Sequence, residues 1–342
     1  MSRAGGTERM TAFLANALCA RHTVSILSLH GGESFFPLDA HVSHIRLPEK
    51  KRLLEIRRFL RKQNVDIVIN VDTGMSIFGI PAALGLKAKV ITWEHSNFYN
   101  DWNSRWFPYI RRFAARHSET VVVLTERDKQ NYETNIRRCR KVIVIGNPVH
   151  PHENLYNTAS KIILSAGQLS PIKRFALIPE IGKIIFPNHP DWQWRICGDG
   201  PQRAELESKI IEYGLEKNII LVGRVSDMES EYVNAAIYVM TSEMEGLPMV
   251  LLEAKSYGLP IVSYDIMTGP ADIVRDGVNG YLAESGNVTA MAERILSLMD
   301  STTLRQHFSD RAIMDMEKFD EERIIEKWEH LIDYLTPSPL YP

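Results

Sequence analysis

The sequence predicts an α/β protein with two doubly wound domains, each built on a parallel sheet covered by helices. Short apolar runs rich in β-branched residues alternate with stretches of helical periodicity. These runs are apolar almost throughout, which is typical of strands buried on both faces of a parallel sheet. The series occurs twice, and a polar stretch with two prolines, Gly146–Ser160, separates the two copies as a linker would.

The strands of both domains are predicted from these apolar runs. The chain should then divide into a first domain over residues 1–148, a second over 156–318 and a last segment over 319–342, with a helix near Glu321–Leu335. Ten runs are expected to form strands: Thr23–Leu29, Val65–Val71, Lys89–Trp93, Thr120–Leu124 and Lys141–Ile145, then Lys161–Ala166, Trp194–Cys197, Ile219–Leu221, Ile237–Thr241 and Pro260–Ser263.

Composition indicates an ordinary soluble globular protein of 342 residues, with 44% hydrophobic and 24% charged residues. The chain holds no apolar run of ~18 residues that would form a spanning helix. Its first residues, "MSRAGGTERM", do not resemble a signal peptide. The cysteines, Cys19, Cys139 and Cys197, are odd in number and widely spaced. These features favour a reducing compartment, so we expect the cytoplasm.

Charge is divided unevenly along the chain. Residues 1–150 carry ten more Lys and Arg than Asp and Glu, whereas the remainder carries an excess of twelve acidic residues. The first half therefore either faces an anionic partner or is neutralised by the second half.

Glu245 and Glu253 bracket the turn and helix of the stretch "TSEMEGLPMVLLEAKSYG". Gly246 allows a close backbone approach to a ligand, and a helix N-terminus with free amides favours a phosphate. Glu245 and Glu253 could each accept hydrogen bonds from sugar hydroxyls, although a charged helix cap and a solvated glutamate would produce the same pattern. The amides expected to be free are those of Leu247, Met249, Val250 and Leu251.

Three further turns follow strands of the second domain, where a parallel sheet binds its ligands. Lys173 lies in "SAGQLSPIKRF", at a position that would neutralise a diphosphate. Gly198 belongs to the tight turn of "ICGDGPQ". In "LVGRVSD", Asp227 should cap a helix and the backbone of Val225 could contact a base edge.

Together these segments resemble glycosyltransferase family 4, whose members are retaining enzymes of the GT-B fold. The segment "SEMEGLPMVLLEA" fits the family signature closely. The resemblance implies that Glu245 binds the donor sugar, that Glu253 binds the ribose and that the amides after Gly246 bind the distal phosphate. It also implies that the last helix crosses back to the first domain. The family usually has arginine where this chain has Gln168, so neutralisation of the diphosphate should depend more on Lys173, helped by Arg174 or Arg224.

The first domain matches the family more loosely. Gly5 and Gly6 in "RAGGTERM" resemble the glycine loop near the donor phosphate and the acceptor. His95 in "VITWEHSN" occupies the place of a histidine close to the transferred sugar. Thr125 and Glu126 form a helix-capping pattern that the family shares.

The resemblance implies a metal-independent, retaining hexosyltransferase with no cofactor. Its donor would be a nucleotide sugar, with UDP expected, and its acceptor a saccharide or lipid-linked saccharide. The chain contains no Asp-x-Asp motif that would hold a metal. The stretch Tyr264–Leu282 resembles members that build bacterial surface polysaccharides. A non-catalytic protein that binds nucleotide sugars on the same fold is the alternative.

Two segments of the first domain are basic and amphipathic, Glu49–Gln63 and Trp102–His117. Such helices are typical of peripheral contact with an anionic membrane, here the inner face of the cell membrane. The other interpretation is that their apolar stripes pack on the sheet and their charges are solvated. Neither segment shows a pattern typical of nucleic-acid binding.

The glycine loop follows Met1 by only a few residues, whereas in a doubly wound domain it follows the central strand. We therefore expect a first strand, with a lead of ~8–12 residues in all, to be missing before Met1.

Overall fold

The computed structural model describes residues 5–29, 32–102, 104–150, 152 and 156–336. It divides into two compact units, one made of Met1–Pro148 with Glu321–Pro342 and the other of Val149–Asp320. We call them the first and second units. Among the described residues, no helix is both long enough and apolar enough to cross a membrane.

The main sheet of the first unit is parallel, with strand order β3-β4-β5-β6. A separate parallel pair, β1 with β2, shares no hydrogen-bonded ladder with β3 among the described residues. The residues of "MSRA" lie outside the described part, and the expected strand before them stays a prediction. The strands are β1 (Ser25–Ser28), β2 (Ser43–Arg46), β3 (Ile67–Val71), β4 (Lys89–Trp93), β5 (Thr120–Val123) and β6 (Lys141–Val144).

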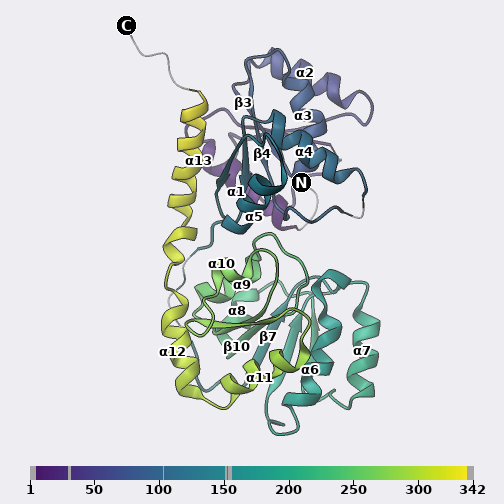
Figure 1. Ribbon diagram of the computed structural model, residues 1–342, viewed down its shortest axis with the longest axis vertical. Helices are drawn as coiled ribbons and strands as arrows, with labels where there is room; N and C mark the ends of the chain where they lie inside the picture. The colour runs from purple at the N-terminus through teal and green to yellow at the C-terminus, as the bar shows by residue number, and fades with distance from the viewer. Residues whose placement is uncertain (1–4, 30–31, 103, 151, 153–155, 337–342) are drawn as a thin grey trace. The chain divides into compact units, whose positions relative to one another are not determined.

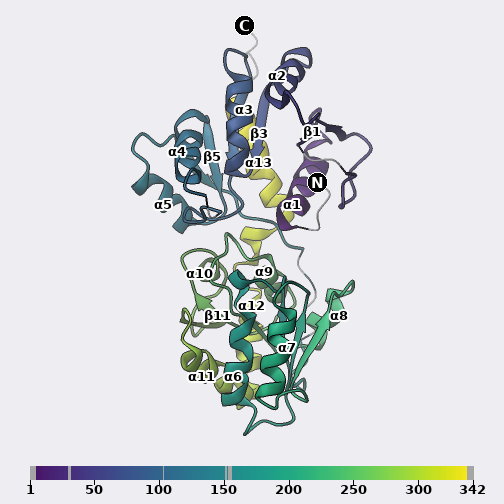
Figure 2. The ribbon, with the colours of Figure 1, turned by 90° about the vertical axis from the view of Figure 1, so that its right-hand side faces the viewer.

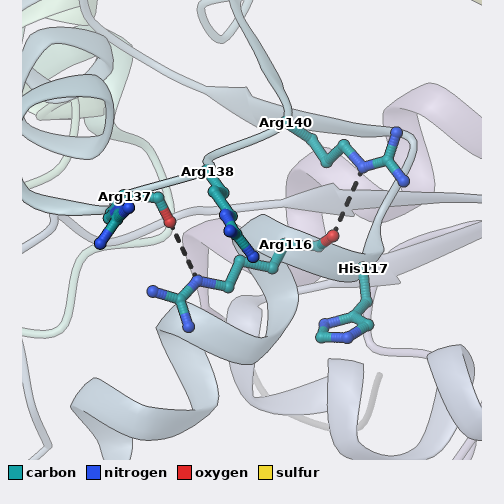
Figure 3. Close-up of a pocket in the computed structure, with 5 residues that line it drawn as sticks. All are labelled: Arg116, His117, Arg137, Arg138 and Arg140. Atoms are coloured by element: carbon teal, nitrogen blue, oxygen red, sulfur yellow. Dashed lines mark hydrogen bonds between the residues drawn. The ribbon is translucent and has the colours of Figure 1, made fainter.

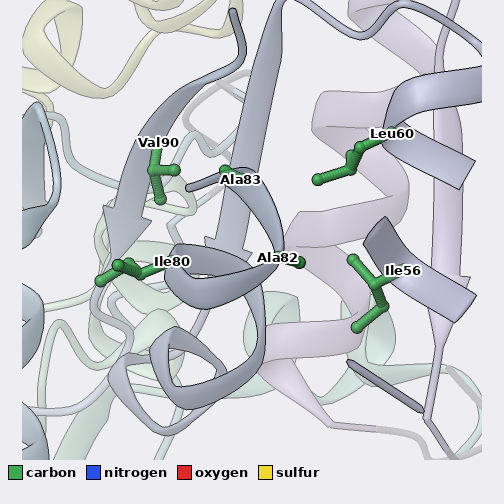
Figure 4. Packing of buried hydrophobic residues seen from close by; sticks show 6 residues of the cluster. All are labelled: Ile56, Leu60, Ile80, Ala82, Ala83 and Val90. Carbon is green, nitrogen blue, oxygen red and sulfur yellow. The ribbon is translucent and has the colours of Figure 1, made fainter. Parts of the chain in front are cut away.

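One hydrophobic cluster joins α2 (Arg52–Lys62) and α3 (Ser76–Ala83) to the sheet (Figure 4). Ile56 and Leu60 of α2 are buried in it, as the second interpretation requires, whereas Leu53 and Leu54 of the same helix are exposed. A second cluster lies around β5 and α5 (Glu126–Asn135), with Tyr132 fully buried. The helix α4 (Phe107–His117) precedes β5 and packs against α3.

The helices α1 (Gly6–Leu18) and α13 (Glu321–Leu335) lie side by side in the first unit (Figures 1 and 2). Trp328 of α13 is buried against Trp93, with 4.9 Å between the ring centroids. Glu329 lies 2.7 Å from Nε2 of His22. The C-terminal helix is thus part of the core of the unit that contains the N-terminus.

The second unit has a six-stranded parallel sheet of order β12-β11-β10-β7-β8-β9. The first strand, β7, is central, and the order reverses beside it, which is the doubly wound pattern. Its strands are β7 (Ile162–Ala166), β8 (Gln193–Cys197), β9 (Ile219–Gly223), β10 (Ile237–Met240), β11 (Ile261–Asp265) and β12 (Gly280–Glu284).

The helices of the second unit cover this sheet. The helix α6 packs against α7 and α11, while α8 and α9 contact strands β7, β10 and β11. Four short 3-10 helices occur in the described chain: η1 (Thr73–Met75) in the first unit, and η2 (Pro171–Lys173), η3 (Phe175–Leu177) and η4 (Met316–Phe319) in the second. The helices are α6 (Ile178–Ile185), α7 (Arg203–Glu212), α8 (Met228–Asn234), α9 (Met249–Ser256), α10 (Pro270–Ile273), α11 (Val288–Met299) and α12 (Thr302–Ala312).

The predicted fold class, α/β with doubly wound parallel sheets, is confirmed, and each predicted run overlaps a strand, although β8, β9 and β11 extend beyond the predicted bounds. Two strands were not predicted, β2 and β12.

Candidate active site

The loops that follow β7 and β10 leave neighbouring strands in opposite directions, which makes this the topological switch point of the second sheet. Ligands of doubly wound sheets bind outside the carboxyl ends of the strands at such a point. The loop after β7 carries Lys173 and the loop after β10 carries Glu245. Because β7 and β10 pair directly, the fold brings these two distant segments to one place.

Lys173 and Glu245 form an ion pair with 2.6 Å between Nζ and Oε1. Both side chains are largely buried, with exposed fractions of 25% and 13%. The hydroxyl of Thr241 donates to the carbonyl of Lys173 and so fixes the 3-10 turn beneath the ammonium group. We expected Arg174 to share in diphosphate neutralisation, but it forms an ion pair with Glu243, with 2.5 Å between Nη2 and Oε1. Both cations of this turn are therefore paired with a glutamate of the loop after β10, Lys173 with Glu245 and Arg174 with Glu243.

The glycine turns after β7 and β8 pack directly on one another. A Cβ on Gly198 would lie 1.9 Å from the carbonyl oxygen of Gly167, and one on Gly200 would lie 2.4 Å from that of Leu169. Gly198 also has a φ of +140°, in the region that favours glycine. The amide of Gly198 donates to the carbonyl of Gly223, the last residue of β9, at 2.7 Å. The turns after β7 and β8 and the end of β9 thus contact one another through their backbones at the carboxyl edge.

The helix α9 begins at Met249, and Pro248 is its N-cap. The amides of Leu247, Met249 and Val250 have no hydrogen-bond partner within the described chain. The expectation that the amide of Leu251 is also free is wrong, because it donates to the carbonyl of Pro248 at 3.0 Å. The proline cap closes the first turn one residue early, so three amides remain to meet an anion.

Two residues of the stretch Tyr264–Leu282 support the turn at Gly246, a role that was not predicted for them. The hydroxyl of Thr268 donates to the carbonyl of Glu245 at 2.6 Å. A Cβ on Gly269 would lie 2.5 Å from Cδ of Pro248 and 2.8 Å from the carbonyl oxygen of Gly246. Thr268 and Gly269 therefore position Glu245 from a separate loop, the one after β11; the Gly-Pro that begins α10 was the signal for such a turn.

Glu253 is held by a tyrosine. The hydroxyl of Tyr232 in α8 donates to Oε2 of Glu253 at 2.8 Å, and its buried ring stacks on Tyr257 with centroids 5.2 Å apart. Burial raises the pKa of Tyr232 well above its ordinary value, so the hydroxyl keeps its proton and acts as a donor. Tyr232 was not predicted, because it precedes Glu253 on a different helix.

The remaining predicted donor residues of the second unit lie at the same edge of the sheet. Gln168 and Arg224 are exposed, and Arg224 forms no ion pair with any described residue. Val225 is half-buried beyond β9, and Asp227 caps α8 by accepting from the amide of Ser230, as predicted. Gly6 begins α1 in the first unit and is exposed. What each of these residues binds stays a prediction.

In the first unit, His95 follows β4. Its ring lies 4.1 Å from that of Trp93, and its enclosed Nε2 has no hydrogen-bond partner among the described residues. Desolvation lowers the pKa of His95 to about 3, so the ring is neutral at ordinary pH. A neutral ring with an unused nitrogen is suited to a hydroxyl partner. Thr125 caps α5 by accepting from the amide of Asp128, as predicted.

Three acidic residues after consecutive strands were not predicted. Glu94 is fully buried and accepts hydrogen bonds from Thr73, Tyr132 and Ser96. Burial, reinforced by the charge of Glu94, raises the pKa of Asp72 to about 7.

Asp128 follows β5, and burial raises its pKa to about 7 as well. The buried Arg111, paired with Asp101 at 2.9 Å, counters part of this negative charge. A carboxylate one or a few residues after each of three strands was the signal available in the sequence. Across the described residues of both units, no group of three or more His, Cys, Asp and Glu side chains is arranged to hold a metal ion.

Comparison with known proteins shows which family this chain belongs to. The model for "Glycosyl transferases group 1" matches residues 148–314, and the model for "Glycosyltransferase Family 4" matches residues 4–153. The amylovoran biosynthesis glycosyltransferase AmsD of Erwinia amylovora is 31% identical over 350 residues, covering 97% of each chain. The chain belongs to glycosyltransferase family 4.

Other relatives of this family 4 glycosyltransferase cover almost the whole chain. An N-acetyl-D-galactosaminyltransferase of Campylobacter jejuni, whose name includes a saccharide on PP-undecaprenol, is 28% identical over 96% of this chain and 95% of that protein. The structure of Anabaena HepE in complex with UDP matches with a TM-score of 0.84 at 18% identity, over 98% of each chain. The latter shows that the fold is GT-B.

A partial structural match is also present. The Staphylococcus aureus TarM structure, with a TM-score of 0.72 and 26% identity, covers 82% of this family 4 chain but 59% of its own. The match thus extends over about three fifths of the length of that protein.

Proposed function

We propose that this family 4 glycosyltransferase moves a hexose or related sugar from a UDP-sugar to a saccharide or lipid-linked saccharide in the synthesis of a bacterial surface polysaccharide. The observation that carries the proposal is the Lys173–Glu245 pair at the switch point of the second sheet, next to the free amides of α9. One cation for a diphosphate and one carboxylate for sugar hydroxyls meet there.

The second unit would hold the donor. Lys173 and the amides of Leu247, Met249 and Val250 would stabilise charge on the departing diphosphate without a metal ion. Glu253, held by Tyr232, would bind the ribose hydroxyls, and Glu245 would bind a hydroxyl of the transferred sugar. Preorganised donors of this kind contribute most when charge develops on the leaving group.

The reaction would retain the anomeric configuration. The bond between the anomeric carbon and the phosphate oxygen breaks, and the acceptor oxygen forms its bond on the same face. The acceptor proton passes to the departing phosphate oxygen, so the leaving diphosphate carries one charge fewer than it would unprotonated. The pairing of Glu245 with Lys173 makes its carboxylate a weaker nucleophile, which favours this route over a covalent glycosyl-enzyme.

The first unit would hold the acceptor. His95, neutral and with a free Nε2, would bind a hydroxyl close to the transferred sugar. Support for a lipid-linked acceptor comes from the Campylobacter relative, and support for a surface polysaccharide from AmsD. A lipid-linked acceptor would require peripheral contact with an anionic membrane at its cytoplasmic face.

The decisive experiment combines binding with turnover. Thermal-shift titration with UDP, GDP and ADP sugars should show the largest stabilisation with a UDP-sugar. Transfer of labelled sugar should then continue in EDTA, and NMR of the product should show the anomeric configuration of the donor. Binding without transfer or hydrolysis of any donor would instead favour the non-catalytic alternative.

A further inference from the structure

A pocket in the first unit is lined by Arg116, His117, Arg137, Arg138 and Arg140 (Figure 3). It lies where α4 ends and where β5 and β6 begin, since Thr120 and Lys141 follow its lining residues closely in the chain. His95 and Asp72 follow the opposite, carboxyl ends of the strands. The pocket is therefore separate from the candidate active site.

The four arginines of this pocket form no ion pair with a carboxylate in the described part of the chain. Arg116 and Arg140 are fixed by guanidinium bonds to the backbone, from Nε of Arg116 to Arg137 at 3.0 Å and from Nε of Arg140 to Arg116 at 3.4 Å. Arg138 has a φ of +63°, a conformation that costs free energy for a residue other than glycine. All four arginines are exposed at the rim of this pocket, and phosphate groups are the natural partners of unpaired guanidinium groups.

The exposed face of α4 continues from this pocket. Within α4, Tyr109, Arg112 and Arg116 follow one another at intervals of three and four residues, which places them on one helix face, and Arg105 lies in the turn just before the helix. Trp106 and Tyr109 are 61% and 62% exposed, and nearby Trp102 is 58% exposed. Arg105 lies over the ring of Trp106, and Arg112 lies over that of Tyr109. Exposed aromatic side chains interleaved with arginine are typical of a membrane interface.

The other basic segment is built differently. Arg57 of α2 donates to the carbonyl groups of Ala82 and Leu84, and Arg58 pairs with Glu55. Arg61 and Lys62, which end this helix, are exposed and form no ion pair with any described residue, but no exposed aromatic side chain belongs to α2. The two segments thus offer similar charge, and only α4 combines it with aromatic side chains.

We propose that the face formed by α4 and the arginine pocket docks this protein on an anionic lipid bilayer. The arginines bind lipid phosphate groups, while Trp102, Trp106 and Tyr109 enter the interfacial layer. Because Tyr109, Arg112 and Arg116 share one exposed face along α4, the helix would lie along the bilayer surface. The inference rests on the proposed function, in which the acceptor is lipid-linked.

Cosedimentation with vesicles tests this surface. The wild type should bind vesicles with one third phosphatidylglycerol in phosphatidylcholine, and bind pure phosphatidylcholine weakly. Arg137→Gln with Arg138→Gln removes two charges without touching either guanidinium–backbone bond, and should lower vesicle affinity by about tenfold. Arg61→Gln with Lys62→Gln is the matched control, with two adjacent exposed cations removed from the same unit, and should lower it by less than about threefold. Equal losses in both variants would overturn the proposal.

A second variant, Trp106→Ala with Tyr109→Ala, tests the aromatic part and should also weaken binding to the same vesicles. If this variant bound the vesicles with the same affinity as the wild type, insertion of the α4 face into the bilayer would be refuted. Inorganic phosphate and chloride at equal ionic strength should release the protein from vesicles equally. Release by phosphate alone would show a site for soluble phosphate instead of a membrane face.

The melting temperature and the UDP affinity of each variant should match those of the wild type, because both measurements report on the fold and the second unit. These readouts also separate the two proposals. Vesicle binding without any donor binding would refute the proposed transfer reaction and leave the docking surface intact. Donor binding and transfer to a soluble acceptor without vesicle binding would refute the docking surface and leave the proposed transfer reaction intact.

Discussion

Nζ of Lys173 lies 2.6 Å from Oε1 of Glu245, although 72 residues separate them in the chain. The contact exists because β7 and β10, whose loops carry them, are neighbours in the sheet. It links the two groups expected to act on the diphosphate and on the sugar. A substitution at either residue should therefore change the interactions of the other side chain, and this coupling is measurable.

Glu245→Gln should separate turnover from donor binding. The carboxylate would hold a sugar hydroxyl more strongly as the bond breaks, so its loss should raise the barrier by ~2–4 kcal/mol and slow turnover accordingly. Lys173 would lose its anionic partner and become freer to meet the diphosphate, so the Kd for UDP should not rise. Steady-state kinetics and calorimetry measure both quantities.

Glu243→Gln is the control, because it breaks the neighbouring pair with Arg174 on a side chain that is 52% exposed. We expect turnover in this variant to stay near the wild-type value. Wild-type turnover in Glu245→Gln would contradict the role assigned to this carboxylate.

Tyr232→Phe should weaken recognition of the ribose. The variant keeps the ring that stacks on Tyr257 but removes the hydrogen bond to Glu253. Loss of a hydrogen bond to a charged group costs ~1–3 kcal/mol, and we expect UDP affinity to fall towards the lower end of that range. Affinity for a 2′,3′-dideoxy analogue should not change. An equal loss for both ligands would show that Tyr232 acts on the fold and not through Glu253; Tyr213→Phe serves as the control.

Gly198→Ala should destabilise the second unit. A Cβ there would meet the Gly167 carbonyl oxygen at 1.9 Å, and neither backbone segment can move without disturbing the adjoining loop. We expect a loss of more than ~2 kcal/mol in the free energy of unfolding, with reduced UDP binding. Gly214→Ala is the control, since Gly214 also has positive φ but no atom within 4 Å of the added Cβ. It should cost ~1–2 kcal/mol, the conformational cost alone.

Asp72→Asn should change how stability depends on pH. Burial first, and the charge of Glu94 second, raise the pKa of Asp72 to about 7 from an ordinary value of 3.8. The folded protein therefore holds this proton more tightly than the unfolded chain, and the resulting stability is complete below pH 3.8 and lost as pH rises to about 7. The amide of the substituted side chain does not ionise, so the variant should be more stable than the wild type above pH 7, by on the order of 4 kcal/mol.

This gain should disappear near pH 4. The other charged groups that act on Asp72 are Glu94 and Arg111, the same two that act on Asp128, and the variant leaves them unchanged. Melting temperatures from pH 4 to 8 supply the test, with the exposed Asp66→Asn, which breaks a pair with Lys87, as the control. A constant difference between Asp72→Asn and wild type at all pH values would contradict the raised pKa.

The local sequence was sufficient to predict most strands, because apolar runs rich in β-branched residues favour a buried strand through their own composition. It was not sufficient for β2, "SHIR", which pairs only with β1 among the described strands and carries polar residues, or for β12, "GYLAE", which begins with glycine at the sheet edge. Both depend on a neighbouring strand more than on their own composition.

The same distinction applies to the candidate site. The Glu-Gly-Leu-Pro turn and the glycine turns could be located because turn chemistry is local. The Lys173–Glu245 and Tyr232–Glu253 contacts depend on strand order and helix packing, which no short motif contains. The engaged amide of Leu251 was missed for a smaller reason: the position of the proline cap decides which amides a first turn uses.

The first unit is assembled from both ends of the chain, and this has a consequence for how it is made. A ribosome releases all of Val149–Asp320 before it releases α13. At ordinary rates of synthesis this delay lasts on the order of 10–30 s. During that time Trp93 lacks Trp328, and His22 lacks Glu329. The nascent first unit thus waits with an uncovered apolar surface, while the second can finish folding, so a nonsense codon near the 3′ end of the message should harm the part of the protein that was translated first.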